Sequence, residues 1–290
     1  MAVAALGMKN VLRHILPGPE KRHYERRGYQ VFRAAFPPEE IAAIADMVRA
    51  LVPGYAGEIR RQDGTFAVND FFPGTTVLRN SLLHAHHSLP DGLEPLSARL
   101  RALVTSPALA DRLQLLDGAA HYTVHQTLLF FAAQTTDIHL DSWSVDTVPR
   151  GHSHTAWIPL QDLNPRSGIP SVIPWPARKV LTESELGIEQ PHASHSERYT
   201  IYHRALVERL CSASPEAVTP LLRKGDFIVW SSLAPHFTLP SFPFPIERLS
   251  LQVLIRPAHR PWGSFIDQPR NRPPEELQQI NERFSIRRDD

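Results

Sequence analysis

The feature that most constrains the fold of this chain is a run of strand-forming residues that leads into a His-x-Asp tripeptide. From Tyr122 to Phe131 the sequence is rich in aromatic and β-branched residues, which favour strands. The run ends close before His139-Leu140-Asp141. In extended backbone, residues i and i+2 point to the same side, so His139 and Asp141 can reach one ligand. We therefore expect a β framework that carries a polar site near the end of a strand.

Further short strands are predicted at roughly even spacing along the chain. They lie at 28–32, 155–160, 171–173, 227–230 and 249–255. The 27 Pro are nearly twice the usual share of about 5%, which disfavours long helices as the dominant element. The pattern predicts a mainly β protein with flanking helices, whose core is a double-stranded β-helix, or jelly roll, behind an N-terminal helical region.

The sequence shows no internal repeat, so we expect a single domain over residues 1–290. We predict an N-terminal helical and support region at 1–120 and a jelly-roll core at 121–256. The core carries a polar insertion at 177–220, and a C-terminal segment covers 257–290.

Helices are predicted at four places, from apolar spacing and from Pro-Pro-Glu-Glu openings. They cover 37–51, 93–103, 196–211 and 273–284, and the charged tail after the last one is expected to fray. The stretch between the first two is expected to be ordered but irregular. Its His84, His86 and His87 could suggest a zinc site, but no Cys or acidic residue stands nearby, so a solvated loop is expected instead.

Charge and composition narrow the class of partner. The 31 Lys and Arg balance 30 Asp and Glu, which predicts no general attraction to nucleic acid or to an anionic membrane. No apolar run reaches 18 residues, so no membrane span is expected. We expect a small-molecule partner; the oligomeric state stays open.

The single cysteine, Cys211, allows no intrachain disulfide and is expected to be an inert helix residue in a reducing cytosol. A cytoplasmic protein is therefore expected. Lys9 and Arg13 follow the first apolar residues, the wrong order for a secretory signal, and an organelle transit peptide stays an alternative.

A second histidine and an arginine complete a set with a recognisable chemistry. His236 follows the predicted strand 227–230, and Arg248 and Ser250 share one face of the next strand. Two neutral imidazoles and one carboxylate leave three positions of an octahedron open, which suits Fe(II), a co-substrate and O2. The planar fork of Arg248 suits the distal carboxylate of a dicarboxylate, with the Ser250 hydroxyl beside it.

In these motifs and their order, residues 24–256 resemble the phytanoyl-CoA dioxygenase-like family of Fe(II)- and 2-oxoglutarate-dependent oxygenases. The matching pieces are the 24–40 opening, Gln126, His139-x-Asp141, Trp157-Ile158-Pro159-Leu160, Gly225-Asp226, His236 and Arg248-x-Ser250. The chain departs from the family at Ser167-Gly168 and at 174–177, where an Asn-Gly turn and a Pro-Gly-Ser-His loop are usual. The departures concern substrate recognition rather than metal binding.

The resemblance implies oxidative decarboxylation of 2-oxoglutarate to succinate and CO2, with hydroxylation of an unactivated C–H bond in a small biosynthetic molecule. By position it implies Fe(II) on His139, Asp141 and His236, and 2-oxoglutarate on Arg248 and Ser250. Gln126 and Thr238 would touch this co-substrate, and Trp143 or Val145 would face the substrate. Because related halogenases lack the carboxylate, Asp141 argues against chlorination.

Two alternatives stay open. The same cofactors can drive epimerisation, desaturation or cyclisation, or the chain can be a non-catalytic jelly-roll module that binds a ligand. Two other His-x-carboxylate tripeptides, His23-Tyr24-Glu25 and His195-Ser196-Glu197, precede elements outside the expected barrel rim and are interpreted as surface pairs.

Overall fold

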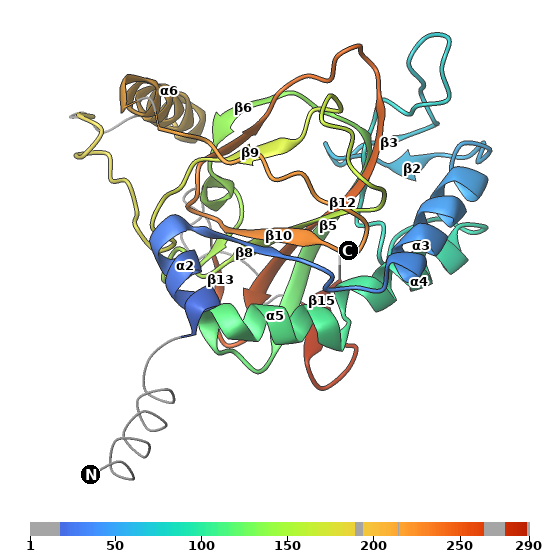
Figure 1. Ribbon diagram of the computed structural model, residues 1–290, viewed down its shortest axis with the longest axis horizontal. Coiled ribbons are helices and arrows are strands. Elements are labelled where there is room, and N and C mark those ends of the chain that lie inside the picture. Colours follow the sequence, from blue (N-terminus) through green and yellow to red (C-terminus); the bar gives the residue numbers. More distant parts are fainter. Residues whose placement is uncertain (1–17, 189–193, 214, 264–275, 289–290) are drawn as a thin grey trace, which may run out of the picture.

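The computed structural model describes residues 18–188, 194–213, 215–263 and 276–288. A large, mostly antiparallel sheet forms its framework (Figure 1). The strand order is β1-β10-β8-β12-β5-β15-β14, and β4 also pairs with β5. These strands are β1 (Tyr29–Phe32), β4 (Leu82–Leu83), β5 (Tyr122–Ala132), β8 (His154–Pro159), β10 (Phe227–Ser231), β12 (Glu247–Pro257), β14 (Leu277–Gln279) and β15 (Phe284–Arg287).

A smaller sheet faces the large one and completes the jelly roll. It contains β6 (Thr136–His139), β11 (His236–Thr238) and β9 (Pro170–Val172) in that order. Two further strand pairs are short: β2 (Ile59–Arg60) with β3 (Phe66–Ala67), and β7 (Asp146–Thr147) with β13 (Trp262–Gly263). The fold class expected from the sequence, a mainly β jelly roll with flanking helices, is confirmed.

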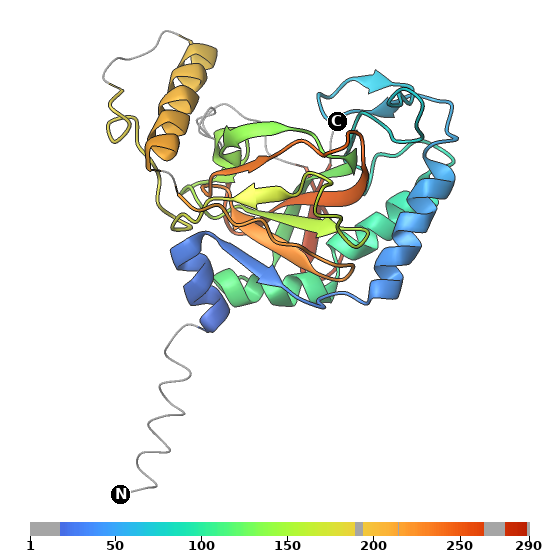
Figure 2. The same ribbon diagram turned by 45° about the horizontal axis from the view of Figure 1, so that its top comes forward.

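Helices cover the outer face of the large sheet, as Figures 1 and 2 both show. They are α2 (Pro19–Arg27), α3 (Pro38–Leu51), α4 (Glu94–Val104) and α5 (Pro107–Asp117). The largest buried apolar cluster lies between these helices and the sheet, and it includes Ile41, Ile44 and Val48 from α3. A fifth helix, α6 (His195–Ala213), lies on the other side of the molecule, beside β6.

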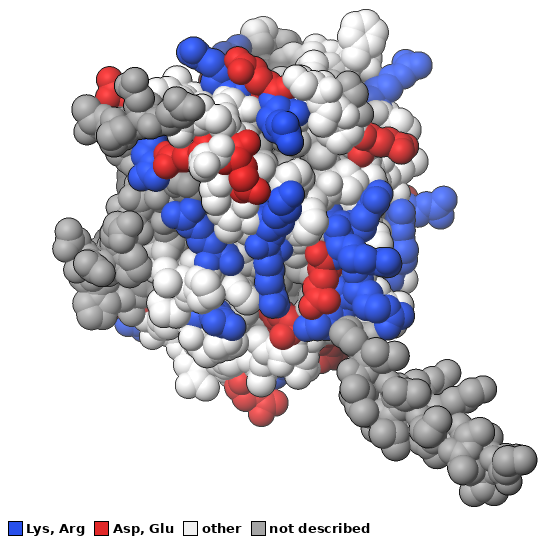
Figure 3. Space-filling view, turned by 90° about the vertical axis from the view of Figure 1, so that its left-hand side faces the viewer, with Lys and Arg blue, Asp and Glu red and all other residues white. Residues whose placement is uncertain are grey.

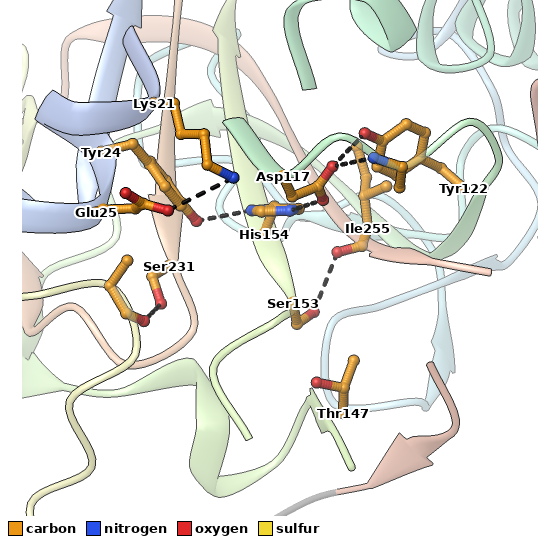
Figure 4. Close-up of polar contacts among 12 residues, drawn as sticks. Lys21, Tyr24, Glu25, Asp117, Tyr122, Thr147, Ser153, His154, Ser231 and Ile255 are labelled. Carbon is orange, nitrogen blue, oxygen red and sulfur yellow. Dashed lines mark hydrogen bonds and ion pairs between the residues drawn. The ribbon is translucent and has the colours of Figure 1, made fainter. Parts of the chain in front are cut away.

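A chain of buried polar side chains fastens the N-terminal helices to the sheet (Figure 4). The Tyr24 hydroxyl lies 2.7 Å from His154 Nδ1, and His154 Nε2 lies 2.7 Å from Asp117 Oδ2. Asp117 Oδ1 accepts a hydrogen bond from the Tyr122 hydroxyl at 2.7 Å. Burial alone would raise the pKa of Asp117, but His154 and these hydrogen bonds hold it at about 2. The chain therefore links α2, β8, α5 and β5.

Most predicted elements are confirmed, within a few residues at their ends, but the predicted helix at 273–284 is wrong. Where the structure describes this segment, it forms β14 and β15, and residues 273–275 lie outside the described part. Phe284 and Ile286 pair in parallel with Tyr122 and Val124 and are buried, so residues 285–287 of the tail expected to fray belong to a core strand. The long-range pairing outweighs the local helical pattern.

Two surface properties bear on the expected partners. On the face shown in Figure 3, basic and acidic side chains are interspersed, which agrees with the net charge of +1. Among the residues that the structure describes, no helix is both long and apolar enough to cross a membrane.

Candidate metal centre and co-substrate pocket

Two histidines face each other across the smaller sheet. His139 ends β6 and His236 begins β11, and the two are direct partners in the antiparallel register. Their ring centroids are 4.2 Å apart. His139 Nδ1 donates to the carbonyl of Asp137 at 2.7 Å, and His236 Nδ1 donates to that of Ala234 at 3.0 Å. Because a carbonyl only accepts, each Nδ1 carries a proton, and in the neutral imidazole Nε2 keeps its lone pair for a metal.

Asp141 supplies a carboxylate to the same point. It begins the 3-10 turn η1 (Asp141–Trp143), and its Oδ1 lies 3.5 Å from His236 Nε2. Its other oxygen, Oδ2, accepts hydrogen bonds from the Thr155 hydroxyl at 2.6 Å and from Trp230 Nε1 at 3.0 Å. The ligand atoms of His139, Asp141 and His236 all lie within 4.8 Å of one another. One carboxylate oxygen is thus anchored while the other faces the two imidazoles.

The three side chains shift one another's pKa values. Burial, followed by the charge of His236, lowers the pKa of His139 to about 4. Burial alone would raise the pKa of Asp141 and lower that of His236. The attraction between the Asp141 carboxylate and the His236 imidazolium outweighs this effect of burial. The Asp141 pKa is therefore held well below its ordinary value, and the His236 pKa is raised. The cluster keeps an ionised carboxylate and one neutral imidazole at neutral pH.

The candidate metal centre opens into a cavity of about 270 Å³ between the two sheets. Arg248 on β12 lines this cavity with only 2% of its surface exposed. Its guanidinium donates to the carbonyls of Gly168 and Ala132 and lies over the Trp157 ring, with 5.4 Å between Cζ and the ring centroid. Burial lowers the pKa of Arg248 to about 10. Among the described residues, no carboxylate forms an ion pair with Arg248, so this buried cation faces the cavity without a directly paired protein anion, although Asp141 lines the same cavity.

The sequence matches the phytanoyl-CoA dioxygenase (PhyH) family over residues 24–241. The chain belongs to this family. The membership confirms both the family resemblance and the expected enzyme class, a 2-oxoglutarate-dependent non-haem iron oxygenase. No curated protein sequence matches the chain.

Three solved structures illustrate the shared fold. The α-ketoglutarate-dependent carbocyclase SnoK from nogalamycin biosynthesis has a TM-score of 0.58 at 16% identity, and the match covers 85% of this chain and 86% of the SnoK chain. The epimerase SnoN, in complex with Fe3+, α-ketoglutarate and nogalamycin RO, has a TM-score of 0.57 at 17% identity and covers 92% and 96%. EctD from S. alaskensis, with 2-oxoglutarate and 5-hydroxyectoine, has a TM-score of 0.55 at 19% identity and covers 89% and 82%.

In this PhyH-family chain, all but one of the predicted site residues line the one cavity. They are Gln126, His139, Asp141, Trp143, Val145, His236, Thr238 and Arg248. The exception is Ser250, which is fully buried two residues beyond Arg248 on the same strand. Among the described residues, its hydroxyl has no hydrogen-bond partner. Of the two other His-x-carboxylate tripeptides, His23-Tyr24-Glu25 does not reach the cavity lining, although Tyr24 is buried rather than exposed, and the side chains of His195 and Ser196 lie outside the described part of the chain.

Several residues in or beside the cavity escaped the sequence analysis. Thr155 and Trp230 hold Asp141 from β8 and β10, but nothing in their local sequence indicates that role. Tyr199 reaches the cavity from α6 in the insertion, and its ring centroid lies 4.8 Å from that of Trp143. His203, also on α6, donates from Nε2 to the carbonyl of Ile138 at 2.8 Å. The insertion is therefore fastened beside β6, the strand that carries His139.

Proposed function

We propose that this protein is an Fe(II)- and 2-oxoglutarate-dependent dioxygenase that hydroxylates an unactivated C–H bond of a small biosynthetic molecule, with release of succinate and CO2. One observation carries the proposal. A two-histidine, one-carboxylate cluster and a buried arginine without a protein anion line the same cavity.

The donor set fits Fe(II). His139 and His236 present Nε2, and Asp141 presents Oδ1, on one side of the cavity. Such a set leaves three positions for a bidentate co-substrate and O2. Bound iron, with 2-oxoglutarate and O2, would supply the oxidising power for C–H cleavage. The protein's part is to orient: Thr155 and Trp230 hold Oδ2, so Oδ1 stays directed at the histidines.

Arg248 fits the distal carboxylate of 2-oxoglutarate. A buried guanidinium with two carbonyl acceptors still lacks the anion that would offset its desolvation. Trp157 stacks under the guanidinium and limits its orientation. Ser250 offers a further hydroxyl on the same strand face, and Gln126 lines the cavity from the neighbouring strand β5. The residues that line the cavity can thus hold a dicarboxylate between Arg248 and the metal centre.

The substrate side of the cavity is aromatic and apolar. Trp143, Val145 and Tyr199 line it beside the metal centre. Ligand cavities usually measure about 300 to 1,000 Å³, so a space of about 270 Å³ that also admits 2-oxoglutarate receives only a small molecule or one end of a larger one. We therefore propose a small-molecule substrate whose reacting part is apolar or aromatic.

Anaerobic absorption spectroscopy tests the co-substrate assignment. The full-length protein should develop a metal-to-ligand band only with Fe(II) and 2-oxoglutarate together. A hydrogen bond to a charged group contributes roughly 1.5 to 3 kcal/mol, so Arg248→Leu should weaken 2-oxoglutarate binding at least about tenfold. Arg256→Leu is the matched control, because Arg256 is also a buried arginine of β12 but does not line the cavity.

Two results would contradict the proposal. If no band forms with wild-type protein, the chain is better described as a ligand-binding jelly-roll module. If Arg248→Leu and Arg256→Leu bind 2-oxoglutarate equally well, Arg248 does not hold it. Product mass then separates the reaction types, since hydroxylation adds one oxygen, desaturation or ring closure removes two hydrogens, and epimerisation leaves the mass unchanged.

A further inference from the structure

A second cluster of possible metal ligands lies outside the cavity. His84, His86 and His87 belong to the turn after β4, which the sequence analysis expected to be solvated. That expectation is wrong, because His84 is only 6% exposed and His86 is fully buried. We propose that these three histidines bind a borderline divalent cation, with Zn²⁺ as the best fit.

The three imidazoles are close enough to share one ion. One ligand nitrogen from each lies within 4.8 Å of the other two, the same limit that the candidate iron ligands meet. The ring centroids are 4.3 Å apart for His86 and His87, 5.1 Å for His84 and His87, and 6.1 Å for His84 and His86. Zinc bonds to histidine of about 2.0 to 2.1 Å place tetrahedral ligand atoms about 3.3 Å apart, so small side-chain adjustments suffice.

The backbone holds the turn in one conformation. Leu82 and Leu83 pair with β5, and the His84 N–H donates to the Thr127 carbonyl at 2.8 Å. The His84 carbonyl accepts from the N–H groups of His87 and Ser88 at 3.0 and 3.1 Å. His84 has φ of 52°, a left-handed conformation that is uncommon outside glycine. Such conformations persist where their surroundings fix them, and they cluster at ligand sites.

A neighbouring hydroxyl selects the ligand atom of His86. His86 Nδ1 lies 2.9 Å from the Thr127 hydroxyl, which leaves Nε2 as the metal-binding nitrogen. Thr127 follows Gln126 in a regularly paired part of β5, so the two side chains point to opposite faces of the strand. Because Gln126 lines the cavity, the cluster lies on the other side of β5 from the candidate iron centre.

The type of ligand limits which metal ions this cluster can bind. Imidazole suits zinc, copper, iron and nickel, whereas magnesium and calcium prefer oxygen. The cluster contains no carboxylate, so the ion would keep its double charge. His87 is the least buried of the three residues, but its ring nitrogens are shielded from solvent, so its side chain would move to admit the ion and a fourth ligand such as water. A tetrahedral site with three histidines and one open position is one that zinc commonly adopts.

Cobalt titration of the metal-free, full-length protein tests this site, because four-coordinate Co²⁺ absorbs far more strongly than six-coordinate Co²⁺. Wild type should bind two equivalents, of which one gives the strong band. His87→Gln should lose that band and one equivalent, and His236→Ala should lose the other equivalent but keep the band. His259→Gln, at an exposed histidine outside both clusters, is the control and should match wild type.

The site is overturned if His87→Gln leaves both the stoichiometry and the strong band unchanged, or if His236→Ala removes all cobalt binding. Thermal unfolding of the metal-free variants checks that each is folded. As a second readout, Zn²⁺ should raise the melting temperature of His236→Ala but not that of the double variant His87→Gln, His236→Ala. An equal rise in both would also overturn the site. These outcomes do not depend on iron or on catalysis.

Discussion

The two hydrogen bonds to Asp141 Oδ2 make a quantitative prediction about iron affinity. Thr155→Val removes the shorter bond, of 2.6 Å, and changes the side-chain shape little. Thr155 is only 1% exposed, so water has little access to replace the lost hydroxyl. A hydrogen bond to a charged group contributes roughly 1.5 to 3 kcal/mol, which corresponds to a factor of roughly 10 to 150 in affinity. Outer-shell changes typically cost 10- to 100-fold in metal affinity, so we expect a loss of about 10- to 100-fold.

Anaerobic competition between the protein and a coloured Fe(II) chelator measures this loss. Thr155→Ser keeps the hydroxyl and should bind iron within about threefold of wild type. Trp230→Phe removes the longer bond, of 3.0 Å, and should weaken iron binding by about tenfold. If a folded Thr155→Val protein binds Fe(II) as tightly as the Ser variant, the carboxylate does not depend on this hydroxyl for its orientation, and the reasoning fails.

Two further predictions concern pH. Asp117 has an ordinary pKa of 3.8 and a folded value of about 2; at about 1.36 kcal/mol per pH unit, this stabilises the fold by about 2 kcal/mol above pH 4, and the contribution is lost as the pH falls toward 2. In urea unfolding, the free-energy difference between wild type and Asp117→Asn should therefore shrink from pH 5 to pH 3; a constant difference would contradict this. Because the His236 pKa is raised above 6.5 while that of His139 is about 4, iron binding should release one proton from His236, and the apparent affinity should rise about tenfold per pH unit up to the His236 pKa. An affinity that does not change between pH 5.5 and 8 would refute it.

The candidate metal ligands could be singled out in the sequence because their signals are local. Strand-forming residues before His139 and the i, i+2 spacing to Asp141 place both side chains on one side of extended backbone. His236 and Arg248 could likewise be placed on or beside predicted strands. Only the order of motifs shared with the family indicates that they lie with His139 and Asp141. What the structure adds is the register, since His139 and His236 are direct cross-strand partners.

The parts that could not be predicted depend on contacts between distant segments. The burial of His86 depends on a two-residue strand, β4, pairing with β5, and such a short strand has no periodicity to detect. The C-terminal strand β15 ends a sequence with a helix-like apolar pattern and becomes a strand because it pairs with both β5 and β14. Thr155 could be assigned to a strand, but not to Asp141, because that contact requires η1 and β8 to be placed in three dimensions.

The direct pairing of His139 with His236 also indicates which parts of this enzyme can change in length without disturbing the candidate metal centre. A slip of one residue between β6 and β11 would turn one histidine to the opposite face and destroy the centre, so a deletion within either strand is not tolerated. The chain between them is under no such restriction, because the pairing fixes the ligands whatever the length of the intervening loop. The insertion that carries α6 and Tyr199 lies in this stretch. Under the proposed function, substrate preference can therefore diverge by lengthening or replacing the insertion while the candidate iron ligands stay in place.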